Sequence, residues 1–306
     1  MAHDAWLDDV EIGIGTWAWG SHMWGYGKKY GEAEVHGAFD AAVDSGVRLF
    51  DTAEIYGRGE SERLLGRFMK KRAETIQIAT KFMPLPWRWR DANLLSALRR
   101  SLDRLGVGRV DLYQIHMPLR PRQVTSWMPP LAEAVTQGLV RDVGVSNYSE
   151  RQMRVAADRL QQLGARLASN QVEYSLLKRN AEFNGVLNAC RELKVRLIAY
   201  SPLAMGLLSA KYTTANPPPG FRGFRYRKTL ARLEPLVALL HDIGQAHGGR
   251  TRSQVALNWT TCKGALPIPG AKNGAQSIEN AGAAGWRLTG DEVARLDEAS
   301  LPFTRL

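Results

Sequence analysis

Short apolar runs alternate with amphipathic stretches along almost the whole chain, and this alternation limits the folds that the chain can adopt. Each run holds four to seven residues and is rich in aliphatic or β-branched side chains. The eight runs are Ile12–Thr16, Val47–Thr52, Ile76–Lys81, Val110–His116, Val140–Ser146, Ala168–Val172, Val195–Tyr200 and Ala265–Ile268. Runs of this kind, separated by helices, are typical of parallel strands buried on both faces. Eight strands with their helices predict a (β/α)8 TIM barrel, an α/β fold.

The stretches between the runs predict the helical layer of this barrel. They are Ala33–Ser45, Ser61–Arg72, Ala92–Leu105, Gln123–Gln137, Glu150–Leu163, Phe183–Leu193, Ser253–Cys262 and Gln276–Ala284. Leu230–Ala246 and Asp291–Ser300 exceed the alternation and predict two additional helices. Long loops are expected at the C-terminal face of the barrel, at Trp17–Tyr30 and at Ala215–Lys228, which is rich in Pro, Gly and Arg. No linker interrupts the chain, so we expect one domain over residues 1–306.

Polar side chains follow three of the predicted strands at their C-terminal ends, where such barrels place their active sites. Asp51 and Tyr56 follow the second run, Lys81 ends the third and His116 ends the fourth. Any one of them alone would be ordinary, because strand-end Asp and Lys residues often form structural ion pairs and Tyr often packs. Together they suit the reduction of a carbonyl group, which needs a proton donor for the developing alkoxide.

Each of these four side chains has a separate role in that chemistry. Tyr56 would donate the proton, and Lys81 would lower the pKa of the phenol. Asp51 can only accept hydrogen bonds when ionised, so it would hold Lys81 charged and oriented. His116 would donate a hydrogen bond to the carbonyl oxygen and orient it toward Tyr56.

Motifs spread over nearly the whole chain make the sequence resemble the aldo-keto reductase family. They are GIGTWAWG (13–20), FDTAEIYG (50–57), ATKF (79–82), DLYQIH (111–116), GVSNYS (144–149), NQVEYS (170–175), YSPLAMGLLSAKY (200–212) and IPGAKNGAQSIEN (268–280). The resemblance implies the barrel and NADPH-dependent reduction of an aldehyde or ketone, with hydride from nicotinamide C4. It assigns the family's catalytic set to Asp51, Tyr56, Lys81 and His116. A cofactor-bound redox sensor or channel-subunit-like protein with little turnover is the alternative.

The resemblance also implies cofactor contacts after the later strands. Ser146, Asn147 and Gln171 resemble the residues that read the nicotinamide carboxamide, and Tyr200 the aromatic that stacks on the ring, with core packing as its alternative. Lys272 resembles the cation for the ribose 2′-phosphate. The remaining expected contacts are Thr16, Trp17, Ser201, Pro202, Leu203, Gly206, Leu207, Lys211, Gly270, Gln276, Glu279 and Asn280.

The expected cofactor is NADPH/NADP⁺, with NADH as the alternative. Gln276 stands where many family members have Arg, and a neutral amide binds a phosphate less strongly than a guanidinium. The preference for NADPH over NADH is therefore expected, but its strength is left open.

Tryptophan residues in the long loops predict an aromatic wall for the substrate. The expected substrate-binding residues are Trp17, Trp24, Tyr56, Trp87 and His116. Arg88, Arg120 and Arg222 are candidates for binding an anionic substituent, with surface placement as the alternative. Stretches such as KFMPLPWR (81–88) and GWRLTGDE (285–292) resemble plant-type pyridoxal reductases, which implies a pyridoxal-like aromatic aldehyde. Met117 departs from those relatives, which tend to carry Trp after the His, so reduction of a broad range of carbonyl compounds stays open.

The balance of charge excludes little by itself. Lys and Arg number 41 against 30 Asp and Glu, a formal net charge of +11. The cations are scattered among the helical stretches, so we expect solvated helix faces rather than a nucleic-acid partner. A basic rim that attracts an anionic ligand is the alternative.

Other classes of protein are disfavoured by the apolar and cysteine content. No apolar stretch reaches the roughly 18 residues of a membrane span, and Met1–Val10 shows no secretory signal. Two cysteines, Cys190 and Cys262, cannot staple a secreted scaffold. We therefore expect a cytoplasmic monomer or homo-oligomer without a membrane or metal partner, acting on a small carbonyl compound.

Overall fold

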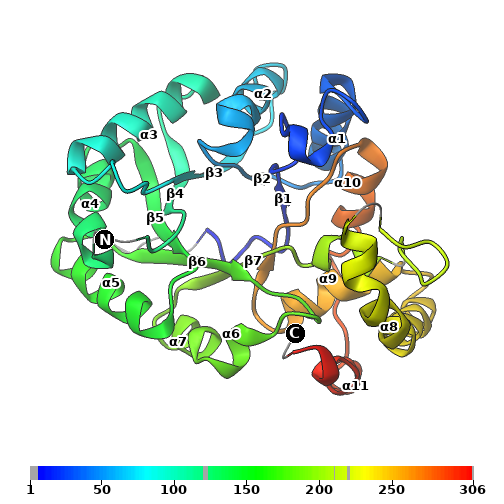
Figure 1. The fold of residues 1–306 in the computed structure, drawn as a ribbon. Helices are drawn as coiled ribbons and strands as arrows, with labels where there is room; N and C mark the ends of the chain where they lie inside the picture. The colour runs from blue at the N-terminus through cyan, green and yellow to red at the C-terminus, as the bar shows by residue number, and fades with distance from the viewer. Residues whose placement is uncertain (1–5, 120–122, 210, 219–220, 305–306) are drawn as a thin grey trace.

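Eight parallel strands, hydrogen-bonded in chain order, form the centre of the protein (Figure 1). The computed structural model describes residues 6–119, 123–209, 211–218 and 221–304, with the backbone alone for 221–228. The strands are β1 (Gly13–Gly15), β2 (Leu49–Asp51), β3 (Gln77–Phe82), β4 (Val110–Ile115), β5 (Val140–Ser146), β6 (Leu167–Glu173), β7 (Arg196–Tyr200) and β8 (Leu266–Pro267). Each lies within its predicted run or extends past it by a residue. The predicted (β/α)8 barrel is confirmed.

Contacts between the first strand and the segment after the last strand close the barrel. An isolated parallel bridge pairs Gly15 with Gly270, and the amide of Gly15 donates a 3.0 Å hydrogen bond to the carbonyl of Pro269. A Cβ atom on Gly15 would lie 2.9 Å from the carbonyl oxygen of Ile268. Glycine at this position therefore permits the close approach of the two backbones.

Helices surround the strands on all sides (Figure 1). The α-helices are α1 (Glu32–Asp44), α2 (Glu60–Met69), α3 (Asp91–Leu105), α4 (Met128–Thr136), α5 (Glu150–Gln162), α6 (Asn180–Phe183), α7 (Val186–Glu192), α8 (Phe221–Ala246), α9 (Arg252–Cys262), α10 (Gly274–Ala281) and α11 (Gly290–Ser300). The short 3₁₀ helices are η1 (His22–Trp24), η2 (Tyr56–Gly59), η3 (Val124–Trp127), η4 (Ala204–Gly206) and η5 (Leu301–Phe303). Helices α8 and α11 are the two predicted additional helices, and they pack against each other.

One predicted loop is wrong over its second half. Residues 215–228 were expected to lack regular structure, but α8 already begins at Phe221 and continues through Pro235. The concentration of proline ends at Pro219, and the following segment is dominated by Arg and aromatic residues, which helices accept. The single Gly223 within it lowers helix propensity without ending the helix.

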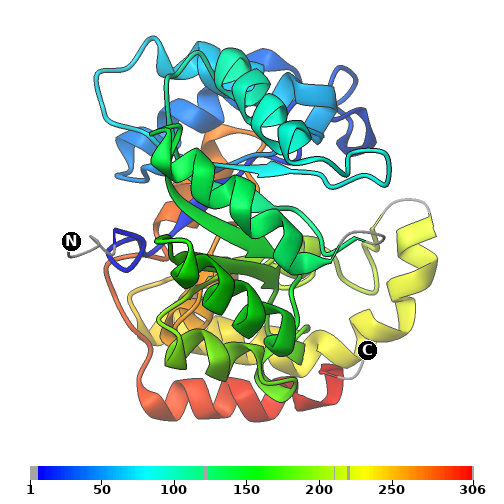
Figure 2. The same cartoon turned by 90° about the vertical axis from the view of Figure 1, so that its left-hand side faces the viewer.

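The N-terminal end of the barrel is closed by a short turn that precedes the first strand. Trp6 and Leu7 are buried against a cluster inside the barrel, and the indole of Trp6 donates a 2.9 Å hydrogen bond to Asp142 on β5. The other buried residues of this cluster are Leu49, Ala79, Leu112, Ala168, Ile198 and Leu266 on the strands, and Ile268 directly after β8. Figure 2 shows this N-terminal turn on the opposite side of the barrel from the start of α8. The N-terminal turn therefore leaves the other mouth, formed by the strand C-termini, open for a site.

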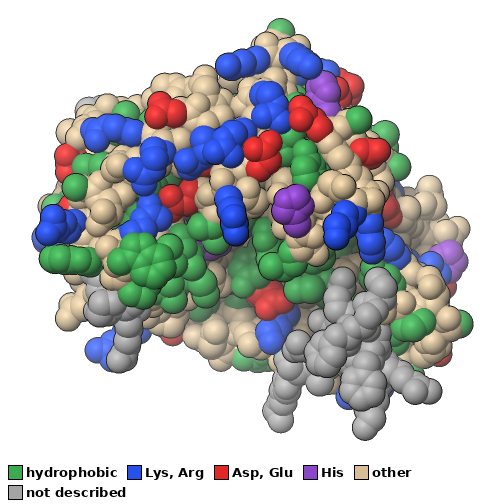
Figure 3. Space-filling model, turned by 45° about the horizontal axis from the view of Figure 1, so that its top comes forward, with side chains coloured by type: hydrophobic (Ala, Val, Ile, Leu, Met, Phe, Trp, Pro, Cys, Tyr) green, Lys and Arg blue, Asp and Glu red, His purple; other side chains and the backbone are tan. Residues whose placement is uncertain are grey.

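Basic and acidic side chains are interspersed on the outer surface. Figure 3 shows this mixture over the part of the molecule where α1, α2 and α3 lie. Arg67 on α2, for example, contacts both Glu32 and Glu60. Within the described residues no helix combines the length and the apolar character needed to cross a bilayer.

Candidate active site

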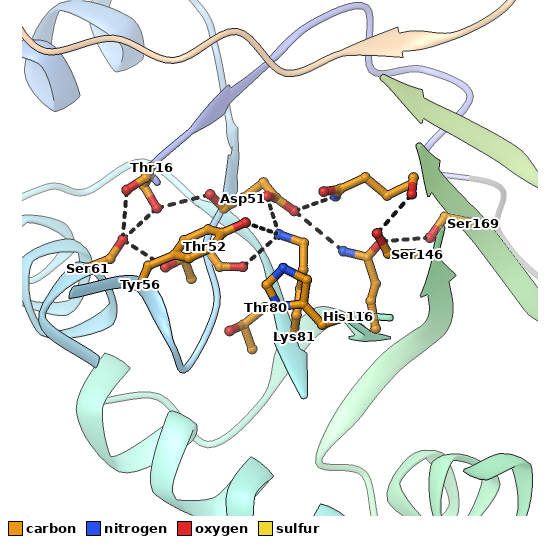
Figure 4. Close-up of polar contacts among 12 residues, drawn as sticks. Thr16, Asp51, Thr52, Tyr56, Ser61, Thr80, Lys81, His116, Ser146 and Ser169 are labelled. Atoms are coloured by element: carbon orange, nitrogen blue, oxygen red, sulfur yellow. Dashed lines mark hydrogen bonds and ion pairs between the residues drawn. The ribbon is translucent and has the colours of Figure 1, made fainter. Parts of the chain in front are cut away.

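A buried lysine lies at the centre of the strand C-termini. Lys81 on β3 is fully buried, and its ammonium group forms an ion pair with Asp51 at the end of β2 (Figure 4). The same ammonium donates to the carbonyl of Thr52 at 2.9 Å and to the hydroxyl of Tyr56 at 3.4 Å. The structure thus brings the predicted Asp51, Lys81 and Tyr56 into one contact network.

The phenol of Tyr56 is shielded from water beside this ammonium group. Burial raises the pKa of Tyr56, while the positive charge of Lys81 acts to lower that pKa. We expected Lys81 to set the direction, but burial is the larger cause and the pKa of Tyr56 is raised. The consequence is that Tyr56 keeps its proton until a stronger base, such as an alkoxide, forms next to it.

His116 follows β4 and faces Tyr56. The two rings lie 5.7 Å apart, centroid to centroid, and are nearly perpendicular. Burial, aided by the charge of Lys81, lowers the pKa of His116 to about 3. His116 is therefore neutral near pH 7, and a neutral imidazole can donate one hydrogen bond without carrying charge.

Two glutamines bind the oxygen of the Asp51 carboxylate that is not paired with Lys81. The amide of Gln171 on β6 donates to Asp51 Oδ2 at 2.8 Å, and the amide of Gln114 on β4 donates to the same oxygen at 3.4 Å. Gly144 makes room for this arrangement, because a Cβ atom there would lie 2.2 Å from Ser169 Oγ and 3.0 Å from Gln114 Cγ. Sequence reasoning missed Gln114, although it stands two residues before His116 and so shares its face of the strand.

The predicted nicotinamide readers form a connected chain across the ends of β5, β6 and β7. Asn147 donates to Ser146 Oγ at 3.0 Å, and Ser146 donates to the carbonyl of Gln171 at 2.8 Å. The hydroxyl of Tyr200 donates to Asn147 Oδ1 at 3.1 Å. Asn147 and Ser201 adopt positive φ angles of 61° and 52°, which are uncommon outside glycine and cluster at functional sites.

Other predicted cofactor contacts occupy three places. Thr16 is fully buried, and its hydroxyl donates to the carbonyl of Asp51 at 3.0 Å and lies 2.7 Å from Ser61 Oγ. Its side chain therefore joins β1, β2 and α2. Lys211 is exposed. The predicted contacts in the β7–α8 loop are Ser201, Pro202, Leu203, Gly206 and Leu207. Pro202 and Leu207 are buried, and the other three are partly exposed.

The remaining predicted contacts lie around the start of α10. The side chain of Gln276 accepts a 2.8 Å hydrogen bond from the backbone amide of Lys272, and Asn280 donates to the carbonyl of Gly270 at 3.4 Å. Glu279 accepts a 2.9 Å hydrogen bond from Thr251. Lys272 and Asn280 are therefore held close to the end of β8, next to β1.

Comparison with known proteins identifies the family. The aldo/keto reductase family model matches residues 11–301. The chain belongs to the aldo/keto reductase family. It is an oxidoreductase of the carbonyl-reducing class, and the predicted membership is confirmed.

Relatives and solved structures agree with this assignment. A chloroplastic pyridoxal reductase of Arabidopsis thaliana is 40% identical, over 94% of this chain and 82% of that protein. An aldo-keto reductase from Klebsiella pneumoniae in complex with NADPH is 27% identical, with a TM-score of 0.75 over 94% of this chain and 90% of that one. The glycerol dehydrogenase from Gluconobacter oxydans has a TM-score of 0.84 at 25% identity, over 97% and 93%.

Tryptophan rings lie beside the predicted catalytic residues of this aldo/keto reductase. Trp17 is 40% exposed; its ring lies 6.3 Å from Tyr56 and packs edge-on against Trp24 at 5.1 Å. Trp87, in the β3–α3 loop, is 71% exposed. Trp24 also contacts Lys272, because its carbonyl accepts a 3.1 Å hydrogen bond from the ammonium group. Trp24 therefore lies between Trp17, which neighbours the predicted proton donor Tyr56, and the predicted phosphate-binding lysine.

Arg88 already has an anionic partner within the protein. Its guanidinium binds both carboxylate oxygens of Glu54, at 2.6 and 3.1 Å, and stacks on Phe82 at 4.3 Å. Glu54 also accepts a 2.8 Å hydrogen bond from the backbone of Met83. The suggestion that Arg88 binds a substrate anion is thus not supported by its contacts. Arg120 and the side chain of Arg222 lie outside the described residues.

Proposed function

We propose that this aldo/keto reductase reduces an aldehyde, of the pyridoxal-like aromatic type, with NADPH as hydride donor. The observation that carries the proposal is the position of the Tyr56 hydroxyl, which lies 3.4 Å from the buried Lys81 ammonium and faces the His116 ring. A proton donor, a buried cation and a neutral hydrogen-bond donor at one place suit a carbonyl oxygen that becomes an alkoxide. The cofactor, when bound, supplies the hydride.

Proton transfer follows from the pKa directions of these groups. His116 donates a hydrogen bond to the carbonyl oxygen and points it toward the Tyr56 hydroxyl. As negative charge develops on that oxygen, the Tyr56 proton moves to it, and Lys81 stabilises the phenolate that remains. The ion pair with Asp51 keeps Lys81 protonated throughout, because burial alone would favour the neutral amine.

The side chains at the C-terminal ends of β5, β6 and β7 fit a nicotinamide. Ser146, Asn147 and Gln171 together carry the donors and acceptors that match a carboxamide group. Tyr200 adds an aromatic ring that is anchored through its hydroxyl to Asn147. Lys272, two residues before α10, is the cation for the ribose 2′-phosphate, which supports NADPH rather than NADH.

The aromatic mouth and the relatives support the substrate class. Trp17 lies next to Tyr56, and a flat aromatic aldehyde that enters between the strand C-termini would cover the Trp17 ring. The 40% identical relative carries the name pyridoxal reductase. Broader carbonyl reduction is the second reading, because Met117 follows His116 and is 38% exposed.

Turnover of a carbonyl panel tests the proposal. The purified protein is given NADPH or NADH with pyridoxal, 4-nitrobenzaldehyde, an aliphatic aldehyde and a simple ketone, and loss of reduced nicotinamide is followed by absorbance. We expect the highest kcat/KM with NADPH and the aromatic aldehydes. Tight NADPH binding without turnover of any compound would favour a sensor and contradict the proposal.

A further inference from the structure

The ammonium group of Lys272 lies between two aromatic rings of the loop that follows β1. Lys272 Nζ is 5.1 Å from the centre of the Trp24 ring and 4.9 Å from the centre of the Tyr30 ring. It also donates a 3.1 Å hydrogen bond to the carbonyl of Trp24. These distances are those of cation–π contacts. The β1–α1 loop, residues 16–31, thus contacts the predicted phosphate-binding lysine through two side chains and one carbonyl.

We infer that Trp24 and Tyr30 are specificity-determining residues, which favour NADPH over NADH by holding Lys272 in place for the 2′-phosphate. The inference rests on the proposed NADPH dependence and adds to it two residues of the β1–α1 loop. Their effect is exerted through Lys272, so they are positioning residues rather than direct ligands of the phosphate.

The two rings are themselves well fixed. The hydroxyl of Tyr30 donates a 2.7 Å hydrogen bond to the carbonyl of Ala18, and burial raises the pKa of Tyr30 to about 12, so the phenol stays neutral. Trp24 packs edge-on against Trp17. The backbone of Lys272 is held in turn by Gln276. A lysine fixed at both ends loses less side-chain freedom when an anion binds.

Selectivity for NADPH over NADH follows because Lys272 would face the 2′-phosphate, which NADH lacks. A free lysine side chain has many rotamers, and ordering it would weaken its pairing with a phosphate. The aromatic rings remove that cost and partly shield the ammonium from water, which strengthens its attraction to an anion. NADH has no 2′-phosphate, so the same rings leave its affinity almost unchanged. Loss of the rings should therefore reduce the preference between the two cofactors.

The same loop also reaches the catalytic residues. Trp17 packs on Trp24 and lies 6.3 Å from Tyr56. The indole nitrogen of Trp24 is buried and has no hydrogen-bond partner among the described residues. Ring packing and Lys272 therefore hold Trp24, and its fluorescence should respond when an anion reaches Lys272.

The test is the affinity of purified variants for NADP⁺ and NAD⁺, measured by calorimetry. Trp24→Leu and Tyr30→Leu should each weaken NADP⁺ binding by about 3- to 30-fold, the effect of losing one cation–π contact. Binding of NAD⁺ should change less than twofold. Tyr30→Phe keeps the ring but loses its bond to Ala18, so it should weaken NADP⁺ binding less than Tyr30→Leu. Trp89→Leu, which changes an exposed tryptophan of another loop, should alter neither affinity.

A double variant with Lys272→Met tests whether the aromatic rings act on NADP⁺ affinity through Lys272. Lys272→Met alone should weaken NADP⁺ binding, and Trp24→Leu should then add almost nothing, because its partner is gone. Equal weakening of NADP⁺ and NAD⁺, or full additivity with Lys272→Met, would overturn the inference while leaving NADPH-dependent reduction intact. If the wild-type protein bound neither cofactor, the proposed function itself would fail. Wild-type-like circular dichroism of each variant excludes misfolding. If one of the two leucine variants misfolds, the variant of the other ring carries the test.

Discussion

The side-chain amide of Gln171 donates a 2.8 Å hydrogen bond to the carboxylate of Asp51. This contact joins a residue of the predicted nicotinamide site to the carboxylate that pairs with Lys81. The predicted cofactor site and the proposed proton-transfer residues therefore share one hydrogen-bond network. Asp51 ends β2 and Gln171 lies on β6, and these strands lie on opposite sides of the barrel, so the hydrogen bond crosses its interior.

Removing this hydrogen bond should destabilise the protein. Gln171→Leu leaves a buried carboxylate with one donor fewer, so the free energy of unfolding should fall by about 1.5–3 kcal/mol. Gln114→Leu removes a longer bond to the same oxygen, at 3.4 Å, and should cost clearly less. Urea unfolding of the two variants measures the difference. Equal losses would mean that packing, and not the bond to Asp51, decides stability here.

Arg88 should support the loop that carries Trp87 rather than bind substrate. Its partner Glu54 is 9% exposed, so Arg88→Leu leaves a nearly buried carboxylate unpaired and should lower stability by about 2–4 kcal/mol. The exposed pair of Arg63 and Glu60 provides the control, and Arg63→Leu should cost less than about 1 kcal/mol.

Kinetics separate this structural role of Arg88 from anion binding. Arg88→Leu should change kcat/KM by the same factor for 4-carboxybenzaldehyde and for the neutral 4-nitrobenzaldehyde. A loss confined to the anionic aldehyde would show that Arg88 reaches the substrate.

His116 should make the protein less stable in acid. Its pKa is about 3 in the folded protein, against about 6.5 unfolded, so folding favours the neutral ring. The resulting stability is present above pH 6.5 and is lost as the pH falls toward 3. Relative to His116→Gln, the free energy of unfolding of the wild-type protein should fall by about 1.4 kcal/mol for each pH unit below 6.5. The neighbouring Lys81 and Tyr56 keep their protons in this range, since both have raised pKa values. If the free energies of unfolding of the wild-type protein and His116→Gln differed by the same amount at pH 7 and at pH 5, the lowered pKa of His116 would be contradicted.

The turn below the barrel should contribute to stability without contributing to catalysis. Trp6 is 4% exposed and fills the N-terminal end of the barrel, so Trp6→Ala should lower the free energy of unfolding by about 3–5 kcal/mol. Trp6→Phe, which removes the bond to Asp142 but keeps a ring, should cost less. Trp89→Ala, at a 58% exposed site, should stay within about 0.5 kcal/mol. Thermal unfolding measures all three, and kcat at low temperature should be unchanged.

Sequence reasoning predicted the parts of the fold that depend on local pattern. Buried strands read as apolar runs, so β1 to β8 were located to within about two residues. The strand-end rule brought Asp51, Lys81, Tyr56 and His116 together, because parallel strands end at one edge. The start of α8 was missed, since composition biased by Gly and Pro hid a helix that packing stabilises.

Contacts that depend on side-chain direction could not be predicted from one sequence. Glu54 and Arg88 are 34 residues apart, and Lys272 and Trp24 are 248 apart. No local pattern marks either pair, because each partner alone looks like an ordinary loop residue. The pKa direction of Tyr56 was predicted from its nearest charge, and burial, which needs the three-dimensional structure, reversed that direction.

Tyr56→Phe tests the central claim most directly. The variant removes one oxygen atom, and with it the proposed proton donor, but keeps the ring beside Trp17 and His116. In a rapid-mixing experiment with bound NADPH and pyridoxal, we predict that the rate of nicotinamide oxidation falls by about 10²- to 10⁴-fold. The Kd for NADPH should stay within about threefold of the wild-type value. A variant that oxidises NADPH at the wild-type rate would show that Tyr56 is not the proton donor.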